Sequence, residues 1–171
     1  MGGFDKSLDD SSITPYDGVL SMASEQLDLM PTTRYQGSKR KIVDWILNRM
    51  EGLEFDTVLD LFGGTGSVSY GFKSLGKEVV YNDVLTSNYH IGRALIENNR
   101  TKIGVHEIND LFSIREEIQY DNLVSRVFDG IYFTEEENSL IDTIAQNIPL
   151  MEDEIKQSMA YFCLFQSLTL K

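Results

Sequence analysis

Apolar and polar residues follow a strand, helix, strand pattern in the middle of the chain. The apolar runs 57–62 and 78–81 are each long enough for one buried strand, and a helical segment, 67–75, separates them. Gly76 follows that segment, where a glycine commonly ends a helix. Because a helical crossover joins neighbouring strands in the parallel sense, we predict an α/β fold with a short parallel sheet.

Helical spacing of apolar residues continues on both sides of this unit. A helix is predicted over 41–50, and its inward stripe consists of Ile42, Trp45, Ile46 and Met50. Another is predicted over 86–99, with three inward candidates, Tyr89, Ala94 and Leu95. The segment 102–129 is only weakly periodic and is predicted to hold short helices around 111–118 and 121–128.

The C-terminal part of the chain has a clearer helical pattern. Thr134 and Glu137 form a capping box, and Pro149 ends the helix that they begin. Its buried face is predicted to consist of Leu140, Ile141, Ile144 and Ile148. The acids at 135–137 suit the positive end of this helix, so we interpret them as capping residues and predict no metal site.

A final helix is predicted over 152–171, and its second half is apolar on nearly every side. Such a helix belongs inside a larger body. We therefore divide the chain into a mobile extension, 1–31, a nucleotide-binding portion, 32–100, and a helical segment, 101–171, that is part of an incomplete domain.

The amino-acid composition restricts the cellular location and the kinds of partner expected for this protein. No apolar run reaches the roughly 20 residues of a membrane span, and no signal peptide is recognisable, so we expect a cytoplasmic protein. The single cysteine, Cys163, lies among apolar residues and is expected to be a buried thiol. A net charge of −12 argues against nucleic-acid binding over the whole surface. One local basic stretch exists, with Arg34, Lys39, Arg40, Lys41 and Arg49.

The candidate chemistry is centred on a glycine turn between the first strand and its helix, Gly63-Gly64-Thr65-Gly66. Glycines permit positive φ and close approach of a ligand. Asp83 ends the second strand about twenty residues later, where an acid can accept hydrogen bonds from ribose hydroxyls. The pattern is that of a Rossmann-type nucleotide site. Because Ser69 replaces the third glycine, the turn alone leaves open nicotinamide or flavin binding, S-adenosylmethionine binding, and a purely structural turn.

Three stretches together resemble a known family. TTRYQGSKRKI, VLDLFGGTGSVSYGFKSLG and VVYND, in this order over 32–83, resemble the adenine-specific DNA methyltransferases of the Dam-like class. The resemblance implies a partial Rossmann-like class I methyltransferase fold with S-adenosylmethionine as the cofactor and double-stranded DNA as the substrate of the complete enzyme. It also implies DNA methylation of the kind found in restriction-modification.

The resemblance assigns roles to individual residues. Tyr35, Gly37 and Lys39 would close over the cofactor, and Lys39 would offer a charge to its carboxylate. Asp60 and the backbone from Phe62 to Gly66, with Gly63 and Gly64 between them, would line its methionine and ribose, Asp83 would hold the ribose hydroxyls, and Val84 would pack near the adenine. Core packing of Tyr35, a turn-capping Asp60 and a solvated Lys39 are the structural alternatives.

One family motif is missing from the chain. The amine of adenine is a poor nucleophile, and the family supplies acceptors and a stacking ring for it through Asp-Pro-Pro-aromatic. The prolines here, Pro15, Pro31 and Pro149, are never adjacent, so we assign no catalytic residue. We expect an inactive N-terminal portion, truncated or half of a split enzyme, that pairs with a missing C-terminal half or self-associates through its final helix. The alternatives are an RNA or small-molecule methyltransferase, and a non-catalytic S-adenosylmethionine-binding or docking module.

Overall fold

The computed structural model describes Met30 and residues 37–169. Its sheet has two parallel strands, β1 (Thr57–Asp60) and β2 (Glu78–Tyr81). Thr57 lies opposite Glu78 and Asp60 opposite Tyr81, and the crossover helix is α3 (Ser67–Ser74). The predicted strands and their parallel pairing are confirmed. β1 ends two residues earlier than predicted, because positions 61 and 62 already belong to the turn.

The first core lies between this sheet and two helices. A short 3-10 turn, η1 (Arg40–Ile42), leads into α2 (Val43–Arg49), which packs on α3. Val43, Leu47 and Phe72 are buried at its centre. The predicted inward stripe of the helix is partly wrong, because Trp45 is 60% exposed and Ile42 is 48% exposed. The helix is rotated so that Val43 and Leu47, one turn apart, face the core.

The two faces of the sheet differ. Val58 and Val79 are half-buried against the α2–α3 core. Side chains alternate between the faces of a strand, and the residues that follow these two, Leu59 and Val80, are paired in register and are 60% and 53% exposed. One face of the sheet is therefore covered and the other leaves apolar side chains uncovered.

The next helix joins the sheet to the C-terminal helices. It comprises α4 (Thr86–Gly92) and a π-helical continuation, η2 (Arg93–Glu97). Ala94 is buried and Leu95 half-buried as expected, but Tyr89 is 50% exposed and that expectation is wrong. The Nζ of Lys73 in α3 donates to three carbonyls at the end of η2, those of residues 95, 96 and 98, at 2.6–2.9 Å. These carbonyls have no partner within the helix, so Lys73 caps it.

The remaining elements are helical. They are α5 (Val105–Phe112), α6 (Leu123–Val127), α7 (Glu135–Asn147), η3 (Ile148–Leu150) and α8 (Glu154–Thr169). α5 begins earlier than the predicted helix over 111–118. Gly104, which has an extended backbone, precedes its first turn, and the carboxylate of Glu107 accepts the Gly104 amide at 2.8 Å and so caps the helix start. The predicted capping box of α7 is confirmed, since Thr134 and Glu137 exchange backbone-to-side-chain bonds of 2.8 and 3.3 Å.

The predicted buried face of α7 is partly confirmed, because Ile148 is fully buried and Ile144 is half-buried beside it, but most of the buried residues of α7 itself are polar. Leu140 is 40% exposed, whereas Asn138, Asp142, Thr143 and Asn147 are buried. The carboxylate of Asp142 accepts the amides of residues 124 and 125 at the start of α6 at 2.8 and 2.9 Å. The Asn147 amide donates to three carbonyls at the end of α5 at 2.9–3.2 Å. These polar groups replace apolar packing because they satisfy neighbouring helix ends.

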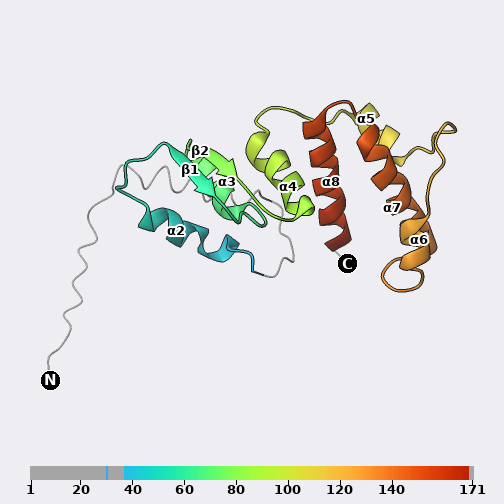
Figure 1. The fold of residues 1–171 in the computed structure, drawn as a ribbon, viewed down its shortest axis with the longest axis horizontal. Coiled ribbons are helices and arrows are strands. Elements are labelled where there is room, and N and C mark those ends of the chain that lie inside the picture. The colour runs from blue at the N-terminus through green and yellow to red at the C-terminus, as the bar shows by residue number, and fades with distance from the viewer. Residues whose placement is uncertain (1–29, 31–36, 170–171) are drawn as a thin grey trace, which may run out of the picture.

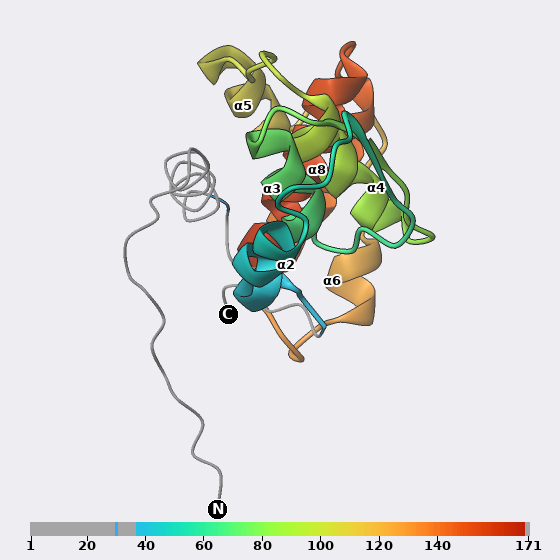
Figure 2. The ribbon, with the colours of Figure 1, turned by 90° about the vertical axis from the view of Figure 1, so that its left-hand side faces the viewer.

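The last helix is packed within the fold. In Figure 1, α4 and α8 lie between the sheet end and the α5–α7 end, and Figure 2 shows α8 behind α2 and α3. Phe162 is buried against α4 and η2, while Met159, Phe165 and Leu168 are half-buried. The larger body that such an apolar helix requires is thus supplied by the chain itself, and the apolar sequence of α8 gives no separate reason to expect a partner at this helix. Cys163 is exposed, so the prediction of a buried thiol is wrong.

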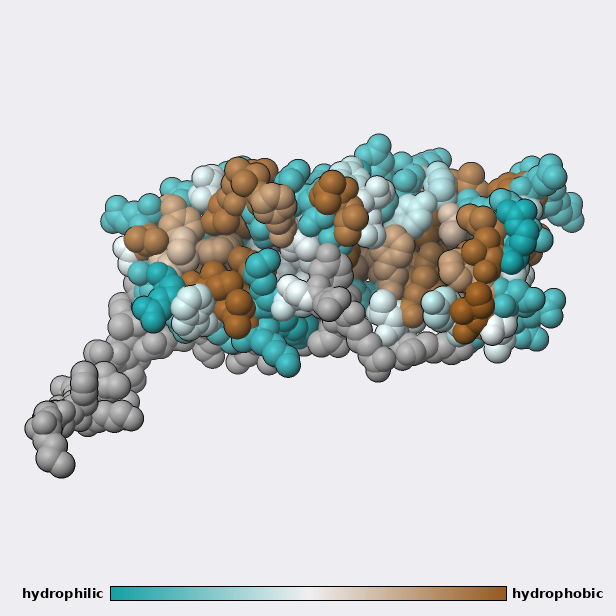
Figure 3. All heavy atoms as spheres, turned by 60° about the horizontal axis from the view of Figure 1, so that its bottom comes forward, coloured by the Kyte–Doolittle hydropathy of each residue, from teal (hydrophilic) through white to brown (hydrophobic). Residues whose placement is uncertain are grey.

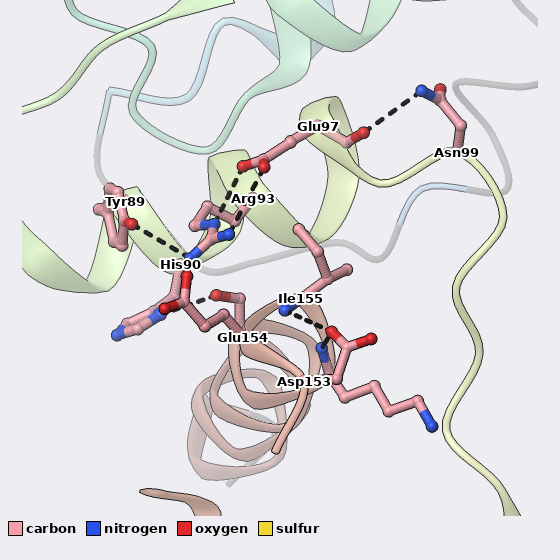
Figure 4. A network of polar contacts seen from close by, with 10 residues as sticks. Tyr89, His90, Arg93, Glu97, Asn99, Asp153, Glu154 and Ile155 are labelled. Carbon is pink, nitrogen blue, oxygen red and sulfur yellow. Dashed lines mark hydrogen bonds and ion pairs between the residues drawn. The ribbon is translucent and has the colours of Figure 1, made fainter. Parts of the chain in front are cut away.

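Polar contacts reinforce the packing of α4 on α8 (Figure 4). The guanidinium of Arg93 binds Glu97 at 2.9 Å and Glu154 of α8 at 2.8 Å. His90 lies 3.1 Å from the hydroxyl of Ser158, and its ring packs on Tyr161 with centroids 4.5 Å apart. Burial, together with the charge of Arg93, lowers the pKa of His90 and favours its neutral form.

Some exposed apolar side chains remain at both ends of the molecule, and Figure 3 shows them on one face. No helix among the described residues is long and apolar enough to span a bilayer. Apart from Met30, the predicted extension 1–31 lies outside the described residues, as does Tyr35.

The contact between α2 and α3 generates a stability prediction. A Cβ on Gly71 would lie 2.8 Å from Cγ1 of Val43 and 3.2 Å from Cδ1 of Leu47. Overpacking of this kind costs about 1–3 kcal/mol, which opposes the helix-propensity gain of about 1 kcal/mol. We expect Gly71→Ala to lower the free energy of unfolding in urea by about 1 kcal/mol.

The same substitution in a Val43→Ala background gives the control, because the clashing methyl is then absent. There Gly71→Ala should raise the free energy of unfolding. Destabilisation of equal size in both backgrounds would contradict this account of the α2–α3 contact.

Candidate functional site

A hollow of about 310 Å³ lies at the carboxyl ends of the two strands. Three parts of the chain line it: the segment 37–39 before α2, the turn between β1 and α3, and the residues that follow β2. These parts lie far apart in the sequence and meet because β1 and β2 are adjacent and parallel. Open α/β sheets bind ligands at this edge.

The end of β2 holds the glycine turn through three consecutive residues. The Tyr81 hydroxyl donates to the carbonyl of Gly64 at 2.6 Å. The Asn82 carbonyl accepts the amide of Gly63 at 3.0 Å, and its side chain donates to the carbonyl of residue 61 at 2.8 Å. The Asp83 carboxylate accepts the amide of Gly64 at 2.9 Å. The turn is thus tied to the second strand at four points.

Two glycines are needed because of the ring of Tyr81. A Cβ on Gly63 or on Gly92 would overlap atoms of that ring. The Tyr81 ring therefore lies between the glycine turn and α4. It fits there only because neither Gly63 nor Gly92 has a side chain. Gly64 and Gly66 have φ values of +55° and +74°, which L-residues with a side chain rarely adopt. Four glycines are thus needed here, two for space and two for backbone conformation.

The charge of Asp83 is stabilised by several donors. Burial opposes ionisation, but the amides of Leu85 and Gly64, each bonded at 2.9 Å, and the side chain of Asn88 outweigh it. The pKa of Asp83 is therefore below its ordinary value. A carboxylate offers about four acceptor positions, so the protein's own donors already use most of them.

A chain of hydroxyls connects the segment before α2 to the turn. The Thr65 hydroxyl lies 2.9 Å from that of Ser67 and 3.4 Å from that of Ser38. Thr65 and Ser67 are 5% and 3% exposed. The contact brings Gly37 and Lys39, the neighbours of Ser38, to one wall of the hollow.

Most of the residues predicted for the cofactor site are brought together. The hollow is lined by six of them, Gly37, Lys39, Phe62, Gly63, Gly64 and Asp83. Val84, the residue expected near an adenine, also lines it and is 90% exposed.

Two predicted residues lie elsewhere. The carboxylate of Asp60 accepts the hydroxyl of Ser69 at 2.6 Å, so it connects β1 to α3 and does not line the hollow. Gly66 also lies outside the lining, where it begins α3 and faces Ile91 and Ile96. Their proposed contacts with a cofactor therefore have no support from this geometry.

Sequence reasoning missed several residues of the site. Ser38, Ser67, Val68 and Leu85 line the hollow, and Tyr81, Asn82 and Asn88 support it. The hydroxyl residues could have been found from their positions beside the glycines. Nothing in the local sequence indicates that the ring of Tyr81 fits against Gly92, because that contact depends on how α4 packs.

The sheet, the glycine turn and the acid after β2 are consistent with a nucleotide-dependent transferase, and comparison with known proteins gives the class. The model of the D12 class N6 adenine-specific DNA methyltransferases matches residues 35–170. The chain therefore belongs to this family of DNA methyltransferases. The predicted family is confirmed.

A curated relative gives a more particular likeness. The chain is 30% identical over 131 residues to the Type II methyltransferase M2.HphI of Haemophilus parahaemolyticus. The alignment includes 77% of this chain and spans 38% of the length of that relative. No solved structure gives a significant match to the chain.

The environment of Asp83 predicts a pH dependence. Its pKa is lower in the folded chain than the ordinary value of about 3.9. Its contribution to stability is therefore complete above that value and is lost as the pH falls through the folded pKa. We expect Asp83→Asn to be less stable than the wild type at pH 6, with the difference shrinking as the pH falls below about 4.

Urea unfolding followed by circular dichroism measures both chains at each pH. Asp129→Asn, which removes an exposed carboxylate, is the matched control. A difference between wild type and Asp83→Asn that stays constant with pH would contradict the role given to the charge.

Proposed function

We propose that this chain binds S-adenosylmethionine in the hollow beside the glycine turn, for transfer of the methyl group to the exocyclic amine of adenine in DNA. The observation that carries the proposal is the meeting of Lys39, the glycine turn and Asp83 around one hollow. The family match supports adenine in DNA over the RNA and small-molecule alternatives.

The lining fits this cofactor chemically. Lys39 offers a cation for its carboxylate, Asp83 offers acceptors for ribose hydroxyls, and Phe62, Val84 and Leu85 offer apolar surface for the adenine. The volume of about 310 Å³ falls at the lower end of the range for small-molecule sites. When bound, S-adenosylmethionine would supply a methyl group on a positively charged sulfur. The partial Rossmann-like architecture predicted from the sequence is part of this proposal.

Asp83 has two roles in this proposal. It holds the amide of Gly64 and so fixes the turn, and the acceptor capacity that remains is directed to the ribose. Its lowered pKa keeps it ionised at neutral pH, which strengthens both sets of hydrogen bonds. Lys39, which lines the same hollow, acts as a positioning cation.

The residues that line the hollow are assigned to the cofactor, so the hydrogen-bond acceptor for the adenine amine must be supplied from outside the hollow. The chain has three prolines and none are adjacent, so it contains no Asp-Pro-Pro-aromatic segment. We propose that a polypeptide with such a segment completes the site by covering the open face of the sheet, where Leu59, Leu61 and Val80 are 52–60% exposed. Self-association through α8 stays a prediction. The apolar sequence of α8 no longer supports it, because α8 packs against α4 and η2 within the chain.

Cofactor binding is tested by calorimetry with S-adenosylmethionine. Asp83→Ala should weaken binding by about 1–3 kcal/mol, the usual cost of leaving a buried polar group unpaired. Lys39→Ala should also weaken it, whereas Lys41→Ala, which removes the same charge two residues away and outside the hollow, should not. Binding of NAD as tight as that of S-adenosylmethionine would refute the assignment.

Because Asp83 also fixes the turn, its variant needs a folding control. Asp83→Asn retains an acceptor and similar volume, so it should bind more tightly than Asp83→Ala at pH 7. If both variants and the wild type bound S-adenosylmethionine with equal affinity, the Asp83 carboxylate would not contribute to cofactor binding.

Whether this chain alone contains a complete active site is tested by measuring methyl transfer from labelled S-adenosylmethionine to duplex DNA. We expect no turnover by the purified chain, because its sequence contains no Asp-Pro-Pro-aromatic segment to hold the hydrogens of the adenine amine. Addition of a fragment with an Asp-Pro-Pro-aromatic segment from a relative of this family should restore turnover. Turnover by the chain alone would show that other residues perform the reaction.

A further inference from the structure

The segment from η1 to the end of α2 combines two cations with an exposed aromatic ring. Trp45 and Arg49 are four residues apart in α2 and therefore share one side of that helix, and Lys41 lies in the η1 turn that leads into it. Lys41 and Arg49 are exposed, and Trp45 is 60% exposed. The guanidinium of Arg49 lies 5.6 Å from the centre of the Trp45 ring.

This face is unusual in an acidic protein. The chain has 15 lysines and arginines against 27 aspartates and glutamates. Exposure of a large ring costs about 25 cal/mol per Å², and Trp45 contributes nothing to the core formed by its neighbours Val43 and Leu47. The face also begins beside the candidate site, because Lys39, two residues before Lys41, lines the hollow.

We propose that the face formed by Lys41, Trp45 and Arg49 binds the phosphate backbone of duplex DNA. Lys41 and Arg49 are both exposed and lie close together in the chain, so both can contact phosphates of one DNA segment. The indole of Trp45 can pack on a sugar and donate its N–H to a phosphate oxygen.

The composition favours DNA over an acidic protein. Interfaces between proteins have apolar centres from which charges are depleted, whereas here a cation lies on each side of a single ring. Arg and Lys side chains are the usual partners of phosphate oxygens. The inference rests on the proposed function only in taking DNA as the substrate, and it does not depend on the cofactor site.

The chain provides its own probe, because Trp45 is its only tryptophan. We expect a saturable change in tryptophan emission when a 20-base-pair duplex is added at low salt. The logarithm of the affinity should fall linearly with the logarithm of the salt concentration. In the double variant Lys41→Ala with Arg49→Ala, that slope should be smaller by about 2, because each phosphate contact contributes about 0.9.

A double variant elsewhere on the chain is the matched control. Arg100→Ala with Lys102→Ala removes the same two charges from an exposed segment after η2 and should leave the slope unchanged. Calorimetry with S-adenosylmethionine should give the same affinity for both double variants and the wild type. Loss of cofactor binding in all chains would therefore refute the proposed function without affecting this inference.

Three results would overturn the inference. The first is DNA binding, detected by fluorescence anisotropy of labelled duplex, without a change in Trp45 emission. The second is an equal loss of slope in the two double variants, and the third is the absence of binding at low salt. A response to poly-glutamate as strong as the response to DNA would assign the face to acidic polypeptides and would also overturn it.

Discussion

The connection between the end of β2 and the glycine turn is the constraint on which the rest of the site depends. Tyr81, Asn82 and Asp83 bond in succession to the turn that follows β1. The turn then fixes where α3 begins, and α3 in turn caps η2 through Lys73. One parallel strand pair thereby determines the position of the hollow, the crossover helix and the start of the C-terminal helices.

Asp83 has a structural role in addition to the cofactor contact proposed for it. Its carboxylate is already bonded to the protein on both oxygens. The same bonds that lower its pKa also order the turn, so the acceptor is fixed in place before any ligand binds. Preorganisation of this kind reduces the entropy lost on binding.

The distribution of apolar surface also follows from the sheet. α2 and α3 cover one face through Val58 and Val79, whereas Leu59 and Val80 are uncovered on the other. The final helix, which has the most continuous apolar sequence, is packed against α4 and η2. The half-covered sheet and the segment 105–150 therefore carry exposed apolar side chains, whereas the described part of α8 has no exposed large apolar side chain.

The two strands, their parallel pairing, the glycine turn, the acid after β2 and the capping box at Thr134 could all be predicted from the amino-acid sequence. Each of these depends on residues close together in the chain or on the handedness of one crossover. Which sides of the helices are buried could not be predicted, because it depends on packing between distant segments. Trp45 and Leu140 face outward and the buried side of α7 is polar, because neighbouring helix ends need its amide and carboxylate groups. The turning of Asp60 toward Ser69 and the fit of Tyr81 between two glycines were likewise set by packing between distant segments, which local pattern does not encode.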